Sequence, residues 1–429
     1  MRVALLVAEL GRSGGMGVIR DWARALDDAV LVLCGEAERS GDEASGRGAP
    51  EELDGVPVRP LAAMADESVD VAVATWWTTA EALWDVPARR RVVLLQSLDQ
   101  RYYHDDEPAD RLGAAAVLDL PVGFVAVSAH LARVVAALRP DAPVREVAPG
   151  IDKAVFAPAP PRTGPGPLRV LVEGQPSLWF KGVADAVAAV RRMREPAAVT
   201  VVAADPAAAG DVGADRVCGA LSPGEMAALY AEHDVLLKLS RFEGLGLPVL
   251  EAFHVGRPAV LTPVGGAAGI AEHGVNALVV GFDDEPGTTD ALDRLARDAA
   301  LRERLGRGAL ATAARWPSRE DGAAAFAAAL RSLAEAEPPA LDAGLRRLSQ
   351  ARRRTVESVR AEEWRRRAAE GEAAWWKDAW RQADERNAEY DRWSRELRAR
   401  IDELQRRPGF RIEEGLKRLG RLGRLGRRR

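Results

Sequence analysis

The stretch 241-RFEGLGLPVLEAFHVGRP-258 carries two glutamates, Glu243 and Glu251, eight positions apart in a largely apolar segment. A run rich in Val and Leu, 234-DVLLKLS-240, precedes it and predicts a strand. Pro248 suits the first turn of a helix, and a later glycine and proline would end that helix. We therefore expect a strand, a glycine loop and a helix, with Glu243 in the loop and Glu251 in the first helical turn.

The glycines of this loop predict a site for an anion. Gly244 and Gly246 allow the backbone to approach a ligand, and the helix start beyond them offers unpaired N–H groups and positive potential. One glutamate can then face a group beyond the anion, while the other accepts hydrogen bonds from hydroxyls on the near side. A ligand with hydroxyls on both sides of a phosphate is a sugar nucleotide. The alternative is that both glutamates only cap and solvate a helix start, where acidic residues are common.

Strand-like and helical segments alternate through the first 330 residues, which is typical of βα units in parallel sheets. A linker rich in Pro and Gly, 157-APAPPRTGPGPL-168, divides them into two series. Two doubly wound halves would place a ligand in the cleft between them. The expected strands are 2–8, 30–34, 69–75, 91–96 and 123–128, then 168–174, 198–204, 234–240, 259–262 and 277–280.

The 429 residues suit two or three domains, and 47% hydrophobic with 29% charged residues is the usual balance of a soluble globular protein. Cys34 and Cys218 are too few and too far apart for a disulfide framework or a Cys-rich metal site, which suits a reducing compartment. The start, 1-MRVALLVAELGRSGG-15, predicts a strand rather than a signal peptide. No run approaches the about 18 apolar residues of a membrane span. These features predict a cytoplasmic protein.

The C-terminal segment differs from the rest of the chain in charge. Residues 340–429 hold 26 Lys and Arg against 16 Asp and Glu, although the whole chain has a net charge of -4. A heptad seam between 376 and 404 indicates a coiled coil, so we expect self-association or a partner enzyme through 340–406. Residues 406–429 suit an anionic surface at the inner face of the cell membrane, each basic residue adding about 1 kcal/mol. A disordered basic tail is the alternative, and we expect no nucleic acid partner because no recognition fold accompanies the charge.

The segment from Glu243 to Glu251 resembles the E-x7-E motif of the retaining glycosyltransferases of family four (glycosyl transferases group 1), which have the two-domain GT-B fold. The resemblance implies an α/β protein of two facing Rossmann-like domains, 1–160 on the acceptor side and 161–335 on the sugar-nucleotide donor side, with a basic helical tail, 340–429. Further landmarks occur in the family's order over roughly the first 330 residues: 14-GG-15, 149-PGIDKAVFAP-158, Lys181-Gly182, 219-GALSPGEMAALYAEHDVLLKLS-240 and 264-VGG-266.

The resemblance also implies roles for the motif. The first glutamate of the family contacts the donor sugar and is often treated as catalytic, and the second binds the ribose of the nucleotide. These roles pass to Glu243 and Glu251. The backbone amides of Gly244, Leu245 and Gly246 would then hold the diphosphate or the sugar.

Lys181 is the second catalytic candidate. It follows the expected strand 168–174, so its ammonium can reach the cleft and neutralise charge on a departing diphosphate. The alternative is a surface lysine. The family usually has an Arg six residues earlier, where this chain has the donor-side candidate Gln175, and often a His where this chain has Gln96. These departures keep open an altered donor or a GT-B scaffold without activity.

Gly14 and Gly15 end the first strand-loop and open an expected helix over 16–26. The segment 15-GMGVIR-20 resembles the glycine fingerprint of dinucleotide-binding domains, except that Arg20 stands where the third glycine should be. Glu36 could be the acidic residue that binds the ribose, so a nicotinamide enzyme is a weak alternative. In the resembled family this glycine pair borders the donor phosphates and the acceptor.

Trp76 and Trp77 follow the expected strand 69–75 and are acceptor-binding candidates, because aromatic faces stack on sugar rings. Core packing is the alternative for both. The same two readings apply to Trp179, Phe180, Tyr102 and Tyr103.

The acid pairs Asp105-Asp106 and Asp283-Asp284 have no His or Cys beside them, so we expect no metal and no cofactor beyond the nucleoside diphosphate sugar itself. The sequence thus predicts a retaining, hexosyltransferase-type glycosyltransferase with a hydroxyl acceptor, such as a lipid-linked or polymeric glycan. Its expected setting is the synthesis of cell-surface polysaccharide or glycoconjugates. The alternative is a non-catalytic GT-B protein that binds partners in a glycan assembly complex.

Overall fold

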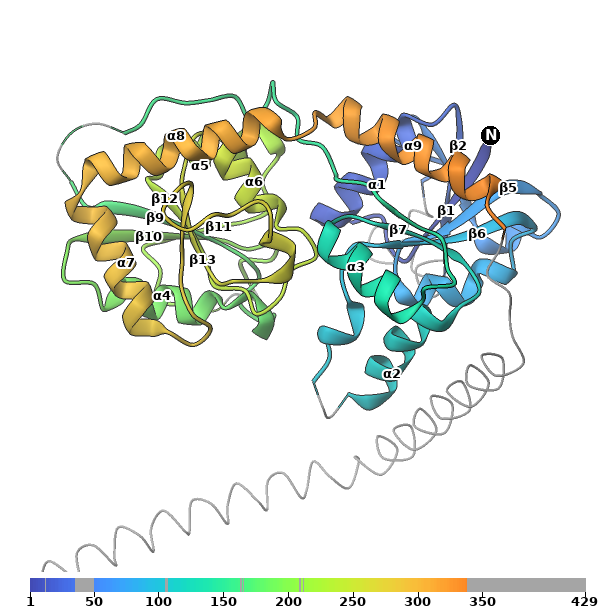
Figure 1. Cartoon of the computed structure of the whole chain (residues 1–429), viewed down its shortest axis with the longest axis horizontal. Coiled ribbons are helices and arrows are strands. Elements are labelled where there is room, and N and C mark those ends of the chain that lie inside the picture. Colours follow the sequence, from blue (N-terminus) through green and yellow to red (C-terminus); the bar gives the residue numbers. More distant parts are fainter. Residues whose placement is uncertain are drawn as a thin grey trace, which may run out of the picture. The chain divides into compact units, whose positions relative to one another are not determined.

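The computed structural model describes residues 1–337, apart from 12, 35–49, 105–106, 163, 165, 208–209 and 211. All of them belong to the first of two units into which the chain divides, Met1–Glu357. The expected coiled coil and basic tail over 340–429 lie outside the described residues, as do Glu36 and the Asp105-Asp106 pair. Figure 1 labels described helices and strands where there is room for a label.

The first sheet has the strand order β3-β4-β2-β1-β5-β6-β7-β8. Its neighbours pair in parallel, except that β3 and β4 pair antiparallel. The strands are β1 (Arg2–Val7), β2 (Asp28–Leu33), β3 (Glu52–Leu53), β4 (Val56–Pro60), β5 (Val69–Ala74), β6 (Ala88–Leu95), β7 (Gly123–Ala126) and β8 (Val144–Glu146).

The second sheet is parallel throughout and has the order β11-β10-β9-β12-β13-β14. The ten expected strands are confirmed, whereas the sequence missed β3, β4, β8 and β11, which hold too few consecutive apolar residues to stand out. The strands of this sheet are β9 (Leu168–Glu173), β10 (Ala197–Val202), β11 (Arg216–Cys218), β12 (Val235–Lys238), β13 (Ala259–Leu261) and β14 (Ala277–Val279).

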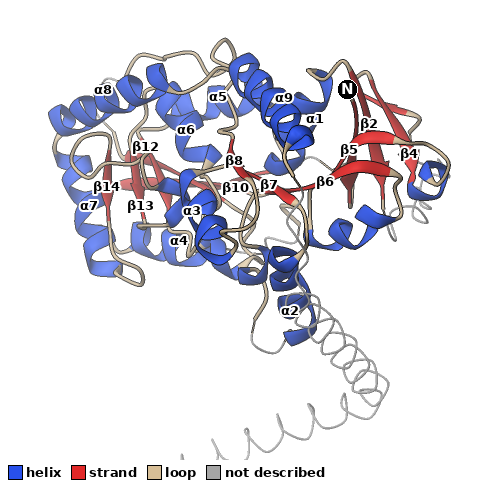
Figure 2. Ribbon diagram, turned by 45° about the vertical axis from the view of Figure 1, so that its right-hand side comes forward, coloured by secondary structure: helices blue, strands red, loops and turns tan. Residues whose placement is uncertain are grey.

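Helices connect the parallel strands and lie on both faces of the sheets, as Figure 2 shows. The α-helices are α1 (Gly14–Arg24), α2 (Pro108–Ala116), α3 (Ala129–Leu138), α4 (Val183–Arg191), α5 (Pro223–Glu232), α6 (Leu247–His254), α7 (Glu285–Arg297), α8 (Ala299–Arg315) and α9 (Arg319–Glu335). The 3-10 helices are η2 (Leu61–Met64), η3 (Trp77–Trp84), η4 (Asp99–Arg101), η5 (Val117–Asp119), η6 (Trp179–Lys181) and η7 (Gly265–Ala267).

Burial on both faces explains why the strands are continuous apolar runs rather than alternating ones. In β1, every residue from Val3 to Val7 is at most 1% exposed. A parallel sheet covered by helices on both sides has no face that needs polar side chains. The buried polar residues Thr75, Ser128 and Ser240 follow the carboxyl ends of β5, β7 and β12.

The last described helix, α9, packs against α1, where Trp22 and Phe326 stack with ring centroids 4.3 Å apart. The backbone just before α9 lies directly against Gly150, since a Cβ on Gly150 would lie 1.8 Å from the carbonyl oxygen of Ser318. Figure 1 shows α9 lying along α1. The expected second domain included α9, and the domain boundaries stay a prediction.

Candidate active site

A left-handed glycine sets the start of α6 after β12. Gly246 has φ +94 and caps the helix, which begins at Leu247 with Pro248 in its first turn, as expected. Glu251 is then the fifth residue of α6 and lies in its second turn, so the expected first-turn position is wrong. The helix starts directly after the glycine, one residue before the proline. Glu243 lies in the loop, as expected.

Three donors hold the carboxylate of Glu243. The Nζ atoms of Lys181 and Lys238 lie 3.0 and 3.3 Å from its Oε1, and Ser240 Oγ donates to the same atom at 2.8 Å. Burial raises the pKa of this carboxyl, but the charges of Lys238 and Lys181 and the hydrogen bonds of Ser240 and Lys181 outweigh burial and lower the pKa to about 2. Glu243 is therefore ionised at neutral pH, with its carboxylate fixed in direction.

Lys238 is a buried cation that the sequence reasoning missed. Its side chain is 2% exposed, and Nζ donates to the carbonyl oxygen of Glu173 at 2.9 Å and to its carboxylate at 2.6 Å. Glu173 and Lys238 end the neighbouring strands β9 and β12, so both side chains emerge at one edge of the sheet. The position of this lysine inside the apolar run 234–240 could have indicated a buried ion pair, because a lysine is rarely buried without a partner.

Lys181 ends η6, and the residue after it holds the chain close to the second sheet. Gly182 has φ +63, and a Cβ there would lie 2.2 Å from the carbonyl oxygen of Leu239. Burial lowers the pKa of Lys181, but the charges of Glu243 and Glu173 outweigh burial and raise it. Since the side chain is only 21% exposed and pairs with a carboxylate 62 positions away, the structure disfavours the simple surface lysine.

Glu251 has the opposite electrostatic environment. Tyr230 donates its hydroxyl to Glu251 Oε2 at 3.0 Å. Burial and the charge of Glu173 raise the pKa of the Glu251 carboxyl to about 8, against the smaller lowering by Tyr230. The two glutamates of the motif therefore differ in protonation near neutral pH, where Glu243 is ionised and Glu251 is largely protonated.

This raised pKa predicts a pH-dependent stability. The folded pKa of Glu251 lies above its ordinary value of 4.5, so its contribution to stability is lost as pH rises from about 4.5 to about 8. Glu251→Gln keeps an acceptor for Tyr230 without the charge. Urea unfolding should therefore show wild type losing stability relative to Glu251→Gln between about pH 5 and about pH 8. The exposed Glu320→Gln is the control, and a pH-independent difference for Glu251→Gln would contradict the prediction.

The two glutamines that depart from the resembled family have protein partners. Gln175 Nε2 donates to the carbonyl oxygen of Asp205 at 3.1 Å, and its Oε1 accepts from the Asp205 N–H at 3.0 Å. Gln175 thus braces the loop after β10. Gln96 Nε2 lies 3.5 Å from the carbonyl oxygen of Thr75, and a Cβ on Gly15 would lie 2.8 Å from Gln96 Oε1.

The glycine pair near the N-terminus belongs to α1 itself. The helix begins at Gly14, not at residue 16 as expected, because Ser13 Oγ accepts from the N–H of Met16 at 3.1 Å and caps it. Gly15 packs on Gln96, whereas a Cβ on Gly14 would meet nothing within 4 Å. Their expected place beside the donor phosphates stays a prediction.

The glycine loop of the second half meets the first half. A Cβ on Gly244 would lie 1.7 Å from the carbonyl oxygen of Gln96, and Ser128 Oγ donates to the carbonyl oxygen of Gly244 at 2.7 Å. Leu245 is buried. The absence of a side chain at Gly244 therefore permits this close backbone approach, and the expected role of these amides toward a diphosphate or sugar stays a prediction.

The two acceptor candidates differ in burial. Trp77 is 4% exposed, its Nε1 donates to Tyr103 Oη at 2.7 Å, and a Cβ on Gly113 would lie 2.7 Å from its ring. This environment favours the core-packing alternative for Trp77. Trp76 is half-buried, with its ring 5.5 Å from that of Tyr102, and remains an acceptor-side prediction.

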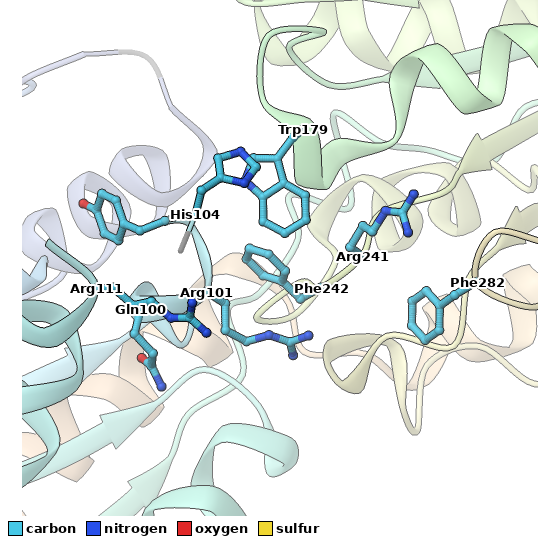
Figure 3. Close-up of a pocket in the computed structure, with 9 residues that line it drawn as sticks. Gln100, Arg101, His104, Arg111, Trp179, Arg241, Phe242 and Phe282 are labelled. Atoms are coloured by element: carbon cyan, nitrogen blue, oxygen red, sulfur yellow. The ribbon is translucent and has the colours of Figure 1, made fainter. Parts of the chain in front are cut away.

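A pocket of about 450 Å³ lies beside these residues, and Figure 3 shows how its side chains converge. The sequence reasoning did not select its arginines, since nothing in their spacing links them. The lining residues are Gln100, Arg101, Tyr103, His104, Arg111, Trp179, Arg241, Phe242 and Phe282.

Within the residues that the structure describes, no group of three or more His, Cys, Asp or Glu side chains is arranged to hold a metal. Asp283 accepts from Arg241 Nη1 at 2.7 Å. In the same part of the chain, no helix combines the length and the hydropathy needed to cross a membrane.

Comparison with known proteins places a family domain on the second half. Residues 169–298 match the family model described as Glycosyl transferases group 1. D-inositol 3-phosphate glycosyltransferase of Stackebrandtia nassauensis is 39% identical over 92 residues, which is 21% of each chain. The same enzyme of Pseudarthrobacter chlorophenolicus is 29% identical over 279 residues, 56% of this chain and 65% of that one. Glycogen synthase of Mycobacterium tuberculosis is 33% identical over 174 residues, 37% of this chain and 41% of that one.

Solved structures resemble more of the chain than these relatives do. Sucrose-phosphate synthase from Thermosynechococcus elongatus has a TM-score of 0.65 at 16% identity, over 77% of this chain and 98% of that one. Anabaena HepE in complex with UDP-glucose has a TM-score of 0.61 at 16% identity, over 78% of this chain and 100% of that one. At this identity the likeness establishes the fold alone, which is GT-B. The matches to the first curated relatives span only about a fifth to a quarter of their length.

Proposed function

Given that residues 169–298 are a glycosyl transferases group 1 domain in a GT-B fold, we propose that the protein is a retaining glycosyltransferase. It moves a sugar from a nucleoside diphosphate sugar to a hydroxyl acceptor. The observation that carries this proposal is the ionised Glu243 between Lys181 and Lys238 at the carboxyl ends of β9 and β12. Ligands of open parallel sheets bind at that edge.

The two lysines on one carboxylate suggest a division of roles. Lys181 is the more exposed of the two, at 21% against 2% for Lys238. In the proposed reaction Lys181 turns from Glu243 to the diphosphate, where it stabilises the charge that develops as the bond to the sugar breaks. Lys238 stays in place and keeps Glu243 ionised toward the hydroxyls of the donor sugar.

Glu251 is the proposed contact for the ribose. A protonated carboxyl both donates and accepts hydrogen bonds, so it can serve the two ribose hydroxyls without placing a negative charge near the diphosphate. Positive potential at the start of α6 adds to the attraction for that diphosphate.

A uridine diphosphate sugar is the first donor to test, because the neighbour HepE was solved with UDP and glucose and with UDP-glucose. Retention at the anomeric carbon is supported by the E-x7-E spacing from Glu243 to Glu251. NMR of the product tests retention, because a retaining enzyme gives a glycosidic bond with the same anomeric configuration as the donor. Synthesis of a cell-surface polysaccharide or glycoconjugate is the proposed setting.

A titration panel of UDP, GDP and dTDP sugars tests the proposal. Lys181→Ala is expected to weaken binding of the preferred nucleotide sugar about 10- to 100-fold, because a charge-assisted contact to the diphosphate is lost. The exposed Lys153→Ala is the matched control. Nucleotide binding of unchanged strength in Lys181→Ala would remove this residue from the site.

The second candidate function is a GT-B scaffold without activity. Gln175 favours it, because its amide is occupied by Asp205 and supplies no cation for a diphosphate. Absence of binding for every nucleotide sugar in the panel would favour the scaffold over the enzyme.

Location and assembly are proposed from residues 340–429 alone. A cytoplasmic protein that self-associates, or binds a partner enzyme, through 340–406 and touches an anionic membrane through 406–429 accounts for their heptads and basic charge. A truncation after Glu337 should lower the mass in sedimentation and abolish liposome flotation. If neither changed, both proposals for this segment would be withdrawn.

A further inference from the structure

The pocket beside Glu243 combines basic and aromatic side chains. Three of its lining residues are arginines, and none of the lining residues that the structure describes is Asp or Glu. Its volume of about 450 Å³ falls in the range of small-molecule sites. Figure 3 shows Arg111 to the left of Phe242, Arg101 below it and Arg241 to its right.

Arg101 places an exposed guanidinium in this pocket. Its guanidinium lies 4.8 Å from the ring centroid of Phe242, and its side chain is exposed. No carboxylate among the described residues pairs with it. Arg241 differs, because Asp283 and Asp185 accept from it at 2.7 and 3.3 Å. A guanidinium stacked on a ring keeps its N–H donors in its own plane, parallel to the ring, where they can meet a carboxylate or a phosphate at the edge.

The aromatic wall of the pocket remains open to solvent. Trp179 is 41% exposed although it is fixed by a hydrogen bond from Nε1 to the carbonyl oxygen of Tyr102 at 3.2 Å and by the ring of His104 at 4.8 Å. Phe282 is 46% exposed. Large exposed aromatic surfaces that are held rigid at a concave site are typical of ligand contacts, and the apolar faces of sugar rings stack on them.

The pocket shares a wall with the charged cluster of the candidate active site. Phe242 is the residue before Glu243, and its ring stacks on that of Phe180 at 4.7 Å. Phe180 precedes Lys181, whose Nζ lies 5.5 Å from the Phe180 ring centroid. Tyr102 packs on both rings and is near enough to Glu243 for the carboxylate charge to raise its pKa, after the larger effect of burial. A hydroxyl of a ligand in the pocket is thus separated from the cluster by little more than these rings.

We propose that this pocket binds the acceptor and that the acceptor is an anionic sugar, a pyranose with a carboxylate or a phosphate group held by Arg101. The inference rests on the proposed glycosyltransferase function and specifies its acceptor class. Trp179 stacks on the sugar ring, and Arg101 meets the anionic group. The electrostatic attraction between the pocket and this group selects against neutral sugars.

NMR titration of the full chain with three probes tests the proposal: D-glucuronic acid, D-glucose 6-phosphate and methyl α-D-glucopyranoside. At least one anionic probe should bind about 10- to 100-fold more tightly than the neutral glycoside, as expected for a hydrogen bond to a charged group. Stronger binding of the first probe identifies a carboxylate acceptor, and stronger binding of the second a phosphorylated one. Equal binding of all three probes, or binding of none, overturns the proposal.

Arg101→Ala should abolish this preference for the anionic probe and leave the affinity for the neutral glycoside within about twofold. Arg304→Ala is the matched control, because this arginine is exposed on α8, away from the pocket. A preference that survives in Arg101→Ala contradicts the assignment.

Trp179→Ala should weaken binding of all three probes alike, since stacking does not depend on charge. The control is Trp84→Ala, which removes an indole of similar exposure, 45%, outside the pocket. Unchanged probe binding in Trp179→Ala would remove the aromatic wall from the site.

UDP binding, measured on the same variants, tests the acceptor inference separately from the glycosyltransferase proposal. Arg101→Ala and Trp179→Ala should bind UDP as wild type does. If wild type binds UDP but does not distinguish the probes, the acceptor inference falls and the glycosyltransferase proposal stands. If wild type binds no nucleotide, the proposed function itself fails.

Discussion

Glu243→Gln is expected to lower kcat for sugar transfer about 100- to 1,000-fold, the usual effect of removing one preorganised electrostatic contact from a reacting centre. The reason is that the carboxylate is the charge on which Lys181, Lys238 and Ser240 converge. Glutamine keeps the shape but not the charge, so the two ammonium groups lose their common partner. Initial rates with the donor found by the nucleotide panel measure the effect.

The expected loss concerns turnover and not nucleotide affinity. Because Glu243 is proposed to face the sugar, UDP binding by Glu243→Gln should stay within about threefold of wild type. Glu320→Gln, an exposed change on α9, is the control. Transfer at the wild-type rate in Glu243→Gln would show that this carboxylate is not part of the reacting centre.

Acid should remove the stabilising contribution of Glu243. Its folded pKa of about 2 lies below the ordinary value of 4.5, so the contribution is fully present above about pH 4.5 and is lost as pH falls toward 2. The stability difference between wild type and Glu243→Gln should therefore narrow over that range in urea unfolding. A difference that stays constant would mean that the ion pairs do not stabilise the fold.

Lys238→Met is expected to lower the free energy of unfolding by about 3–5 kcal/mol, the cost of removing one partner from a buried ion pair. The Nζ atom of Lys238 contacts the carboxylates of both Glu173 and Glu243, and its side chain is 2% exposed. Methionine fills a similar volume but carries no charge. The carboxylates of Glu173 and Glu243 would then repel each other with Lys181 as the lysine left beside them. Urea unfolding measures the change.

The exposed Lys153→Met is the control for this substitution and should change stability by less than about 0.5 kcal/mol. Glu173→Gln in the Lys238→Met background should restore part of the lost stability, because it removes one of the two carboxylates that are then left with Lys181 as their lysine. Lys238→Met should also lower kcat, since Glu243 loses its more buried partner. A Lys238→Met protein as stable and active as wild type would show that this lysine neither stabilises nor orients the site.

The order of residues along the chain was enough to establish several features. Continuous apolar runs predicted the ten principal strands, because a strand covered on both faces needs no polar side chain. The glycine loop and Pro248 predicted the start of α6 to within a residue. Lys181 and Glu243 could be expected at one edge of a sheet, because both follow the carboxyl ends of predicted strands.

Only the tertiary structure decided the chemistry of that edge. The sequence treats Glu243 and Glu251 as a pair, yet the pKa of one falls to about 2 and that of the other rises to about 8. Position in the chain does not reveal that Lys238 turns toward the first glutamate, or that Arg101 meets Phe242 in one pocket. Desolvation and Coulomb interactions depend on distances through space, and those distances exist only after two separate sheets and their loops have packed together.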